Sequence, residues 1–338
     1  KITIRRLNVD FQPLPFADGT VVAVYPAERC LEVRLFADLS ERLVGKPTGE
    51  DGEQAFFGML WYPGPYGIIS RHYWTERIEP GKSADTIRIY APPEFNEFAD
   101  IKPGAWRISA PVPGNAHRYG PGPVFNIYDS DTVTMEDIEV WSAPGFTFGI
   151  SCNRGKLTFR RVNIRPKPGS GRLMSTWRDG FHVKGNSATL LWDKCIVAGM
   201  NDDAFNISTH SSVVHKIISP TQIEVRQKFP LGHIPWQSGT TIVAADEPAR
   251  RILGRTKILK VQTGTEPPPI ENKPAAPIST LTFDQPIPGL TPGIMVWSPE
   301  SSNPDTTLRE CKIEMSCRMQ SPVILDRCEV TALLWFYN

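Results

Sequence analysis

The feature that most constrains the fold of this chain is an eight-residue pattern that occurs six times. Apolar residues occupy its first, third, sixth and eighth positions, and two polar residues separate its two halves, as in VTMEDIEV at 133–140. Copies begin at residues 2, 133, 157, 190, 306 and 323, the one at 306 with a polar first residue. The copies at 133, 157 and 190 follow one another at spacings of 24 and 33 residues. A repeat of this length is typical of a solenoid.

The same pattern predicts which kind of solenoid forms. Each half of a copy alternates apolar and polar residues like a short strand, the two central polar residues mark a turn, and no helical periodicity lies between the copies. We therefore expect an all-β fold, a right-handed parallel β-helix. An ordinary β-sandwich with chance similarity is the alternative, and the shared phase of the six copies argues against it.

Two long stretches interrupt the repeat. They contain alternating strand patterns, such as GTVVAV at 19–24 and QIEV at 222–225, and neither has a helical pattern. Each is expected to form a small antiparallel, barrel-like β insert. The predicted division is therefore a β-helix made of 1–11, 123–210 and 301–338, with inserts at 12–122 and 211–300.

Charge and hydropathy exclude two classes of partner. The chain carries 37 Lys and Arg against 36 Asp and Glu and has no basic cluster, so it lacks the electrostatic footprint of a nucleic-acid-binding protein. No segment approaches the ~18 consecutive apolar residues of a membrane helix, and no membrane partner is expected. Three of the six cysteines, Cys195, Cys311 and Cys328, fall at apolar positions of the repeat and are predicted to be buried free thiols.

The candidate functional residues lie on a second, shorter repeat. The pentapeptide that begins at Asp179 (DGFHV) matches the one that begins at Asp203 (DAFNI), so the same strand occurs twice and opens each time on an acid. Side chains alternate across a strand, which places His182 and Asn206 on the outer face, opposite the apolar residues. Neighbouring coils stack about 4.8 Å apart. We therefore expect Asp179, Asp202 and Asp203 to share a water-accessible patch, with Asp202 on the other side of the backbone from Asp203.

Three carboxylates in one patch suit glycoside hydrolysis. Like charges at this distance raise at least one pKa, which leaves a protonated acid beside an ionised one at neutral pH. Glycosidases need this pairing, because an acid protonates the leaving oxygen while a carboxylate activates water or attacks as a nucleophile. The alternatives are a turn-capping cluster, since Asp is common in turns, or a calcium site.

Side chains suited to a sugar stand near the acids in the sequence. The expected substrate-binding residues are Arg172, Trp177, Arg178, His182, Asn201, Asn206 and His210. Trp177 is either a stacking platform or a core plug, and Arg178 either binds substrate or neutralises Asp179. Asn206 alternatively belongs to an asparagine ladder, and His210 to local structure at the start of the second insert. The His and Cys spacings give no zinc pattern, and no phosphate loop or nucleophile elbow is visible, so neither a metal nor a cofactor is expected.

On these residues the chain resembles glycoside hydrolase family 110, the exo-acting α-1,3-galactosidases. The matching segments are 2–24, 126–150, 172–176 (RLMST) leading into 179–182 (DGFH), 202–207 (DDAFNI) and 283–289 (FDQPIPG). The resemblance implies a parallel β-helix interrupted by small β-barrel inserts. It also implies an inverting, metal-independent enzyme that releases terminal galactose, with Asp179, Asp202 and Asp203 as its catalytic carboxylates.

The chain departs from that family at two places near the expected sugar pocket. The family usually continues its Asn-Val or Asn-Ile with His-Gly, whereas Ser208-Thr209-His210 stands here. It also tends to have Gly-Met-Gly where this chain has Phe146-Thr147-Phe148-Gly149. Both changes bear on galactose specificity more than on hydrolysis.

Three other functions stay open. Polygalacturonases of family 28 share the fold, an Asp-Gly strand and an Asp-Asp pair, but this chain has no matching Gly-His-Gly or Arg-x-Lys. A polysaccharide lyase would use a Lys or Arg base with calcium on the acids, and a non-catalytic β-helix would bind carbohydrate without turnover. In each case the expected partner is an oligosaccharide or polysaccharide, the expected location is secreted or periplasmic, and a homo-oligomer remains an option.

Overall fold

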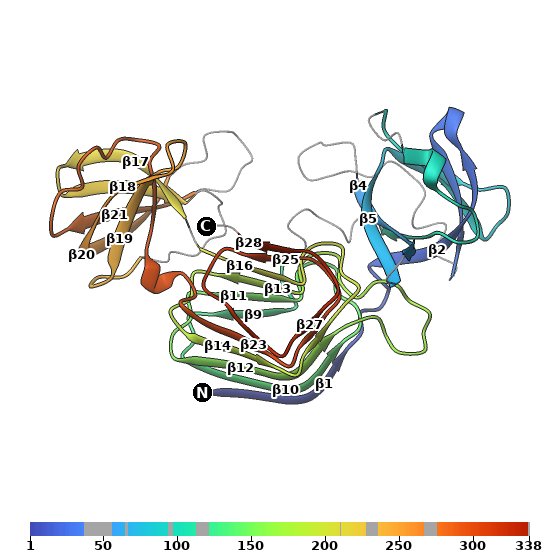
Figure 1. Ribbon diagram of the computed structural model, residues 1–338, viewed down its shortest axis with the longest axis horizontal. Helices are drawn as coiled ribbons and strands as arrows, with labels where there is room; N and C mark the ends of the chain where they lie inside the picture. Colours follow the sequence, from blue (N-terminus) through green and yellow to red (C-terminus); the bar gives the residue numbers. More distant parts are fainter. Residues whose placement is uncertain are drawn as a thin grey trace.

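The computed structural model describes residues 1–36, 56–64, 67–93, 97–112, 122–209, 211–227, 236–266 and 276–336. Within these residues the chain consists of β-strands, turns and three short 3-10 helices, η1 (Pro26–Glu28), η2 (Glu97–Asp100) and η3 (Pro299–Ser301). Figure 1 shows a stack of parallel strands beside two antiparallel units. The prediction of an all-β fold with parallel sheets is confirmed. None of the described helices is long and apolar enough to cross a membrane.

Nine of the described strands form one parallel sheet, and the eight-residue copies supply all of them. Each copy is either a single strand or two short strands on either side of its turn. In chain order the strands are β1 (Ile2–Val9), β10 (Thr132–Val140), β12 (Lys156–Ile164), β14 (Thr189–Asp193), β15 (Ile196–Val197), β23 (Asp305–Arg309), β24 (Lys312–Ile313), β26 (Ile324–Asp326) and β27 (Glu329–Val330). The copies pair in phase, with Val133 opposite Ile2 on one side and Leu157 on the other.

The predicted turn inside each copy is a residue with a left-handed backbone. The fifth residue of every copy has a φ between 50° and 57°, and these residues are Arg6, Asp137, Arg161, Lys194, Glu310 and Arg327. A single residue in this region redirects the chain and leaves the strands on both sides free to pair. The pattern thus bends the sheet at the same place in every coil.

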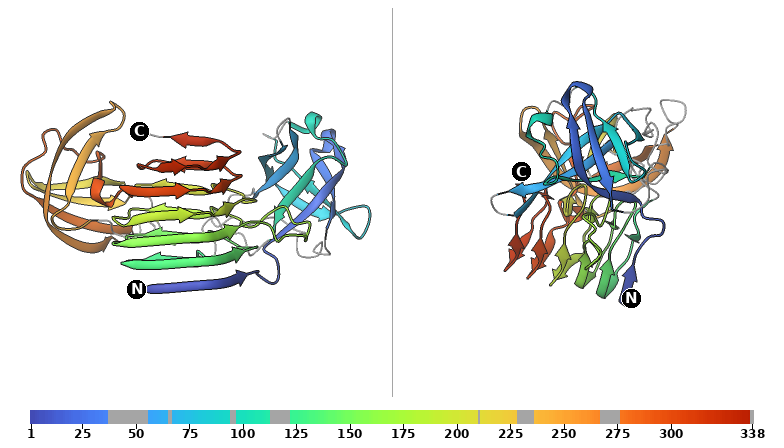
Figure 2. Two further views of the ribbon diagram at one scale, coloured as in Figure 1. Left: turned by 60° about the horizontal axis from the view of Figure 1, so that its bottom comes forward. Right: turned by 90° about the vertical axis from the view of Figure 1, so that its right-hand side faces the viewer.

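Six other described strands form the second parallel sheet, which carries the acid-bearing repeat. They are β9 (Phe125–Tyr128), β11 (Phe148–Ser151), β13 (Phe181–Lys184), β16 (Phe205–Ser208), β25 (Cys317–Met319) and β28 (Leu334–Phe336). Each coil contributes a strand to both sheets, so the coils stack in sequence order, as Figure 2 shows from the side. The pairing is consistent with the predicted β-helix.

Aromatic side chains stack between the two sheets. Phe125, Phe148, Phe181 and Phe205 lie one above another with ring centroids 4.7, 4.7 and 4.9 Å apart. Stacking follows from the register, since the same inward position of each strand is aromatic, and such pairs contribute about 0.5–1.5 kcal/mol each beyond burial. The predicted buried free thiols Cys195 and Cys311 belong to this core, whereas Cys328 is free but only partly buried.

A buried asparagine ladder holds one corner of the stack. Asn153 Nδ2 donates to Asn186 Oδ1 at 2.8 Å, and Asn186 Nδ2 donates to Asn303 Oδ1 at 2.8 Å. The three side chains also bond backbone groups, including the carbonyl oxygens of Ile127 and Ile150, so they satisfy the turn in each coil. Asn206, the candidate ladder residue in the sequence, is not one of these three.

The two antiparallel units have different architectures. The first is a sheet of seven described strands, β2 (Phe16–Tyr25), β3 (Cys30–Leu35), β4 (Phe56–Gly64), β5 (Gly67–Thr75), β6 (Arg77–Pro80), β7 (Thr86–Tyr90) and β8 (Arg107–Pro111), here called the N-terminal sheet. The second is a closed barrel of β17 (Ser212–Ser219), β18 (Gln222–Gln227), β19 (Thr241–Asp246), β20 (Arg251–Glu266), β21 (Ala276–Phe283) and β22 (Met295–Trp297). Both units lie on the side of the stack that carries the six-stranded sheet (Figures 1 and 2).

Candidate active site

The three acids come together at the beginning of two paired strands. Asp179 lies two residues before β13 and Asp203 two residues before β16, and these strands pair in parallel with Phe181 opposite Phe205. One carboxylate oxygen from each of Asp179, Asp202 and Asp203 lies within 4.8 Å of the others. The register of the repeat thus brings together the carboxylates that the sequence predicts to share a patch.

The Asp202 carboxylate lies within 4.8 Å of the other two, and residues 201 and 202 form a bend, to which strand alternation does not apply. The patch is also less open to water than expected. Asp179 is 1% and Asp203 4% exposed, whereas the side chain of Asp202 is 31% exposed. Of the three, Asp202 is the carboxylate in substantial contact with solvent.

Asp179 forms a close pair with His182. Nδ1 of His182 lies 2.6 Å from Oδ2 of Asp179. Burial raises the pKa of Asp179 to about 6, against the opposing charges of Lys184 and Arg178. Burial, and then the charge of Lys184, holds the pKa of His182 well below its usual value. At neutral pH the imidazole is therefore neutral, and its Nδ1–H donates to a largely ionised carboxylate.

The other two acids are also difficult to ionise. The pKa of Asp202 is raised by burial and by the charge of Asp179, while Arg178 Nη1 lies 3.4 Å from its Oδ2. Burial and the charges of both other acids raise the pKa of Asp203 to about 7. The group therefore holds a proton at neutral pH, as the sequence predicts for one member of the cluster. Arg178 forms an ion pair with Asp202, and its charge also acts on Asp179, the partner considered from the sequence.

Lys184 is a site residue that the sequence reasoning missed. It occupies the outward position after His182 on β13, and its Nζ donates to Asn206 Oδ1 at 2.5 Å and to Ser208 Oγ. Burial lowers its pKa to about 8, although the charge of Asp179 acts in the opposite direction. In the run DGFHVK, the alternation that places His182 on the outer face also places Lys184 there, so the pattern could have identified it. Asn206 thus holds a lysine beside the acids, and its amide also bonds Asp179.

Arg318 and Ser316 were also missed. Arg318 pairs with Asn206 in the register of β25 and β16, and its Nε lies 3.5 Å from Asp203 Oδ2. Ser316 Oγ donates to Asp203 Oδ1 at 3.2 Å. The sequence contains a signal for this strand. CRM at 317–319 follows an eight-residue copy, as FHV at 181–183 and FNI at 205–207 follow earlier copies.

Two candidate binding residues lie elsewhere. Arg172 Nη1 donates to Asp10 Oδ1 at 2.6 Å, so its guanidinium anchors the loop before the acids to the end of the first coil. Trp177 is 2% exposed and belongs to the core between the sheets, which makes it the core plug and not a stacking platform. The Trp177 ring is thus buried away from any sugar, and the Arg172 guanidinium is engaged by Asp10.

Asn201 connects the acids to the N-terminal sheet. Its side chain is fully buried, with Oδ1 and Nδ2 lacking hydrogen-bond partners among the described residues. Its backbone oxygen lies 2.6 Å from His72 Nε2, on β5. The last candidate, His210, lies outside the described residues.

The cluster could also hold a metal ion, since three carboxylate oxygens lie within 4.8 Å of one another. Two cations already pair with it, Arg178 with Asp202 and Arg318 with Asp203, and the charge of Lys184 acts on Asp179. Raised carboxyl pKa values and three nearby cations suit proton transfer better than binding of a divalent cation.

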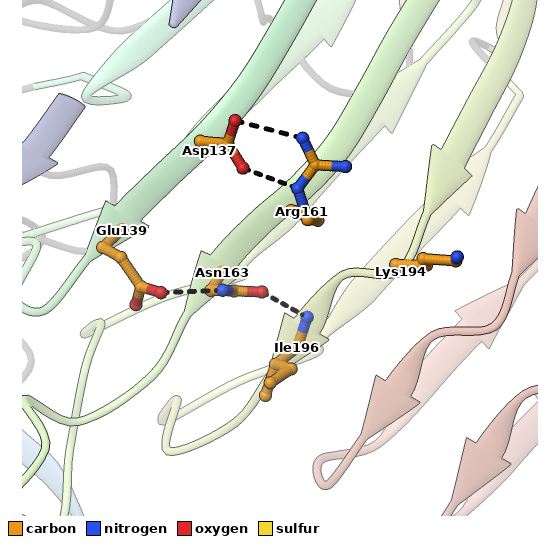
Figure 3. A pocket seen from close by; sticks show the side chains of 6 residues that line it. All are labelled: Asp137, Glu139, Arg161, Asn163, Lys194 and Ile196. Atoms are coloured by element: carbon orange, nitrogen blue, oxygen red, sulfur yellow. Dashed lines mark hydrogen bonds and ion pairs between the residues drawn. The ribbon is translucent and has the colours of Figure 1, made fainter. Parts of the chain in front are cut away.

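A hollow of about 440 Å³ lies on the nine-stranded sheet, which does not carry the acids. Figure 3 shows its six lining residues, Asp137, Glu139, Arg161, Asn163, Lys194 and Ile196. Arg161 forms two hydrogen bonds with Asp137, and Asn163 bridges Glu139 and the Ile196 backbone. Its polar groups are thus largely paired with one another, and the acid cluster remains the candidate active site.

The chain is similar in sequence to several α-1,3-galactosidases. No family model matches the chain. Alpha-1,3-galactosidase B of Bacteroides thetaiotaomicron is 26% identical over 243 residues, which are 67% of this chain and 37% of that protein. Alpha-1,3-galactosidase A of Shewanella woodyi is 25% identical over 217 residues, 61% of this chain and 34% of that protein. A namesake from Bacteroides fragilis is 30% identical over 98 residues, 29% of this chain and 16% of that protein.

The match thus spans about a third of the length of the first two relatives and 16% of the third. The match to the Bacteroides thetaiotaomicron enzyme covers 67% of this chain. The motifs around Asp179 and Asp203 predict this similarity. The comparisons confirm that the chain resembles the α-1,3-galactosidase family.

Proposed function

We propose that this protein is a glycoside hydrolase that releases terminal α-1,3-linked galactose from glycans. The observation that carries the proposal is the cluster of Asp179, Asp202 and Asp203, in which burial and mutual repulsion raise the carboxyl pKa values. Such a cluster holds a protonated acid beside an ionised carboxylate at neutral pH, which hydrolysis of a glycosidic bond requires. The names of the similar proteins support galactose as the released sugar.

The three acids would have separate tasks. Asp203, with a pKa of about 7, donates a proton to the leaving oxygen; its Oδ2 lies 3.5 Å from Arg318 Nε but accepts no hydrogen bond within the described residues. Asp202, the most exposed of the three, takes a proton from the water that attacks the anomeric carbon. Asp179, bound by His182, keeps the pKa values of its neighbours high. Proton balance is complete, because one proton enters the leaving group and one leaves the water.

Inversion at the anomeric carbon is part of the proposal, and it rests on the family resemblance. Inverting enzymes typically separate acid and base by about 6.5–9.5 Å to leave room for water. The nearest carboxylate oxygens here are closer than that, within 4.8 Å. The configuration of the released galactose is therefore a direct test of this part.

We also propose the architecture and setting that go with this function. The two parallel sheets would be faces of one right-handed β-helix of 1–11, 123–210 and 301–338, with 12–122 and 211–300 as inserts. The in-phase strand pairing supports it, and an experimental structure tests it. We infer a secreted or periplasmic location, which fractionation of the source cells tests, and sedimentation of the purified chain tests homo-oligomer formation.

The activity is tested by incubating the protein with α-1,3-galactobiose and following the anomeric signals by proton NMR. β-Galactose is expected as the first product, and Asp203→Asn should lower kcat by about 10²- to 10⁴-fold, the usual contribution of a general acid. First release of α-galactose would contradict inversion. No release from any α-galactoside would contradict the hydrolase, and glycan binding without turnover would instead favour a carbohydrate-binding module.

A polysaccharide lyase is the second candidate, because Lys184 has the properties of a general base. Burial lowers its pKa to about 8, and the neighbouring acids are arranged closely enough to bind a cation. Incubation with a uronate-containing polysaccharide would then produce the ultraviolet absorbance of an unsaturated uronate, and a chelator would abolish it. Absence of this absorbance with calcium present rejects the lyase.

A further inference from the structure

The proposed hydrolysis gives Lys184 no task, although its amine lies beside the acids. In the register of the six-stranded sheet it lies between Ser151 on β11 and Ser208 on β16, which are 5% and 4% exposed. Both neighbours are short, so they leave room for the lysine chain. Its Nζ donates to Ser208 Oγ and, at 2.5 Å, to Asn206 Oδ1, two residues closer to Asp203 along β16. The amine is thus directed toward the acids.

The hydrogen bond from Lys184 fixes the orientation of the Asn206 amide. An ammonium group only donates hydrogen bonds, so it must face the amide oxygen and not the amide NH2 group. The NH2 group of Asn206 is then directed at Asp179, whose carboxylate it bonds. His182 Nδ1, 2.6 Å from Oδ2, is the second donor to that carboxylate. Lys184 therefore stands at one end of a chain of hydrogen bonds that reaches Asp179.

The charge of Lys184 acts on the same carboxylate. Burial raises the pKa of Asp179, and the charge of Lys184 is the largest of the effects that oppose it. Burial lowers the pKa of Lys184, and Asp179 is in turn the largest opposing charge. An ionised Asp179 is, after burial, the main cause of the raised pKa of Asp203. The other charged or titratable groups around the amine and Asp179 are Arg178, His182, Asp202 and Arg318.

We propose that Lys184 is a positioning residue, which orients the Asn206 amide toward Asp179 and keeps the catalytic proton on Asp203. The inference rests on the proposed function and gives a further residue a role in it. Without the ammonium group, Asp179 loses its largest opposing charge and the amide is free to turn. Asp179 then competes for the shared proton, and a proton held there is lost to the general acid, Asp203.

The position of the proton is measured by NMR titration of protein labelled with carbon-13 at the aspartate carboxyl groups, which needs no substrate. Asp179→Asn and Asp203→Asn identify the two signals. In the parent, Asp203 should titrate above Asp179, since their pKa values are about 7 and about 6. In Lys184→Met, Asp179 should titrate about one pH unit higher than in the parent and above Asp203.

Three further variants make the titration specific. Lys184→Arg retains the charge and should keep the parent order. Lys184→Gln can still donate to Asn206 Oδ1 but has no charge, so it should show the same reversal and carries the test if Lys184→Met does not fold. Lys156→Met removes an exposed lysine of β12, in the nine-stranded sheet, and should change neither signal.

The pH profile of kcat on α-1,3-galactobiose is the second readout. Its basic limb should move to lower pH in Lys184→Met, because Asp203 loses its proton earlier, and kcat at pH 7.5 should fall about 10-fold with KM little changed. The parent order of titration in the neutral variants, or an unmoved profile, would overturn the role of Lys184 and leave the hydrolase intact. If the parent hydrolyses no galactoside, the proposed function fails, and the titration alone decides the role of Lys184.

Discussion

The raised pKa of Asp203 comes from the surroundings of its carboxyl group. Burial removes water from the carboxylate and two neighbouring acids repel its charge, while Arg318 and Ser316 offset only part of the effect. Its pKa of about 7 lies well above the ordinary value of 3.8. A carboxyl group with such a pKa can both hold and release a proton near neutral pH, which is the requirement for a general acid.

The same raised pKa values make stability depend on pH. Between about pH 4 and 7 the folded protein binds more protons at Asp179 and Asp203 than the unfolded chain does, because their folded pKa values of about 6 and 7 exceed 3.8. Their contribution to the free energy of unfolding therefore falls as pH rises through this window. Asp203→Asn, which removes one titrating group, should flatten the slope.

Urea unfolding at pH 5 and pH 7.5 measures this prediction on the parent and the Asp203→Asn variant. The variant should lose less stability than the parent between the two values, and at pH 7.5 it should be at least as stable. A steeper loss in the variant would mean that the carboxylate at position 203 stabilises the fold in its ionised form.

At the scale of the strand, the sequence predicted what depends on repetition and missed what depends on distant partners. The eight-residue copies predicted the strands of the nine-stranded sheet and a turn between the halves of each copy, because inward and outward positions recur in phase. The partner of Arg172 could not be predicted, because Asp10 lies 162 residues earlier. Trp177 and Asp202 lie outside regular strands, where alternation gives no direction.

Removing one side chain of the asparagine ladder should markedly lower the free energy of unfolding. Asn186 is its central member and bonds both Asn153 and Asn303, so Asn186→Ala leaves buried polar groups unpaired on two neighbouring coils. The expected loss in the free energy of unfolding is about 3 kcal/mol, within the range for unpaired buried groups. Urea denaturation measures it.

A matched change tests whether the ladder position is what matters. Asn163→Ala removes an asparagine of the same stack that is only partly buried and bonds Glu139 and the Ile196 backbone at the sheet surface. It should cost about 1 kcal/mol, the usual net value of such bonds. Equal losses for the two variants would show that the ladder has no special role.

At the scale of the whole molecule, the N-terminal sheet contacts the segments that carry the site. Asp18 on β2 accepts a hydrogen bond from the Leu173 backbone at 2.8 Å, and His72 on β5 meets the Asn201 oxygen at 2.6 Å. Leu173 and Asn201 belong to loops that lead directly to Asp179 and Asp202. The sheet is therefore placed to fix the loops that position the acids. These loops lie outside the regular strands of the coils.

Removing the contact at His72 should therefore impair catalysis more than stability. The side chain is exposed and its bond to the Asn201 oxygen is worth about 1 kcal/mol, so His72→Ala should change the free energy of unfolding by about that amount. Since small misplacements of catalytic groups are costly, kcat on galactobiose should fall about 10-fold. Amide exchange at 201–203 should quicken, while exchange in the stacked core, at 181–183, stays slow. His72→Gln can still donate to the oxygen and should recover most of the activity. Unchanged exchange at 201–203 together with full activity would mean that the acids are positioned by the coils alone.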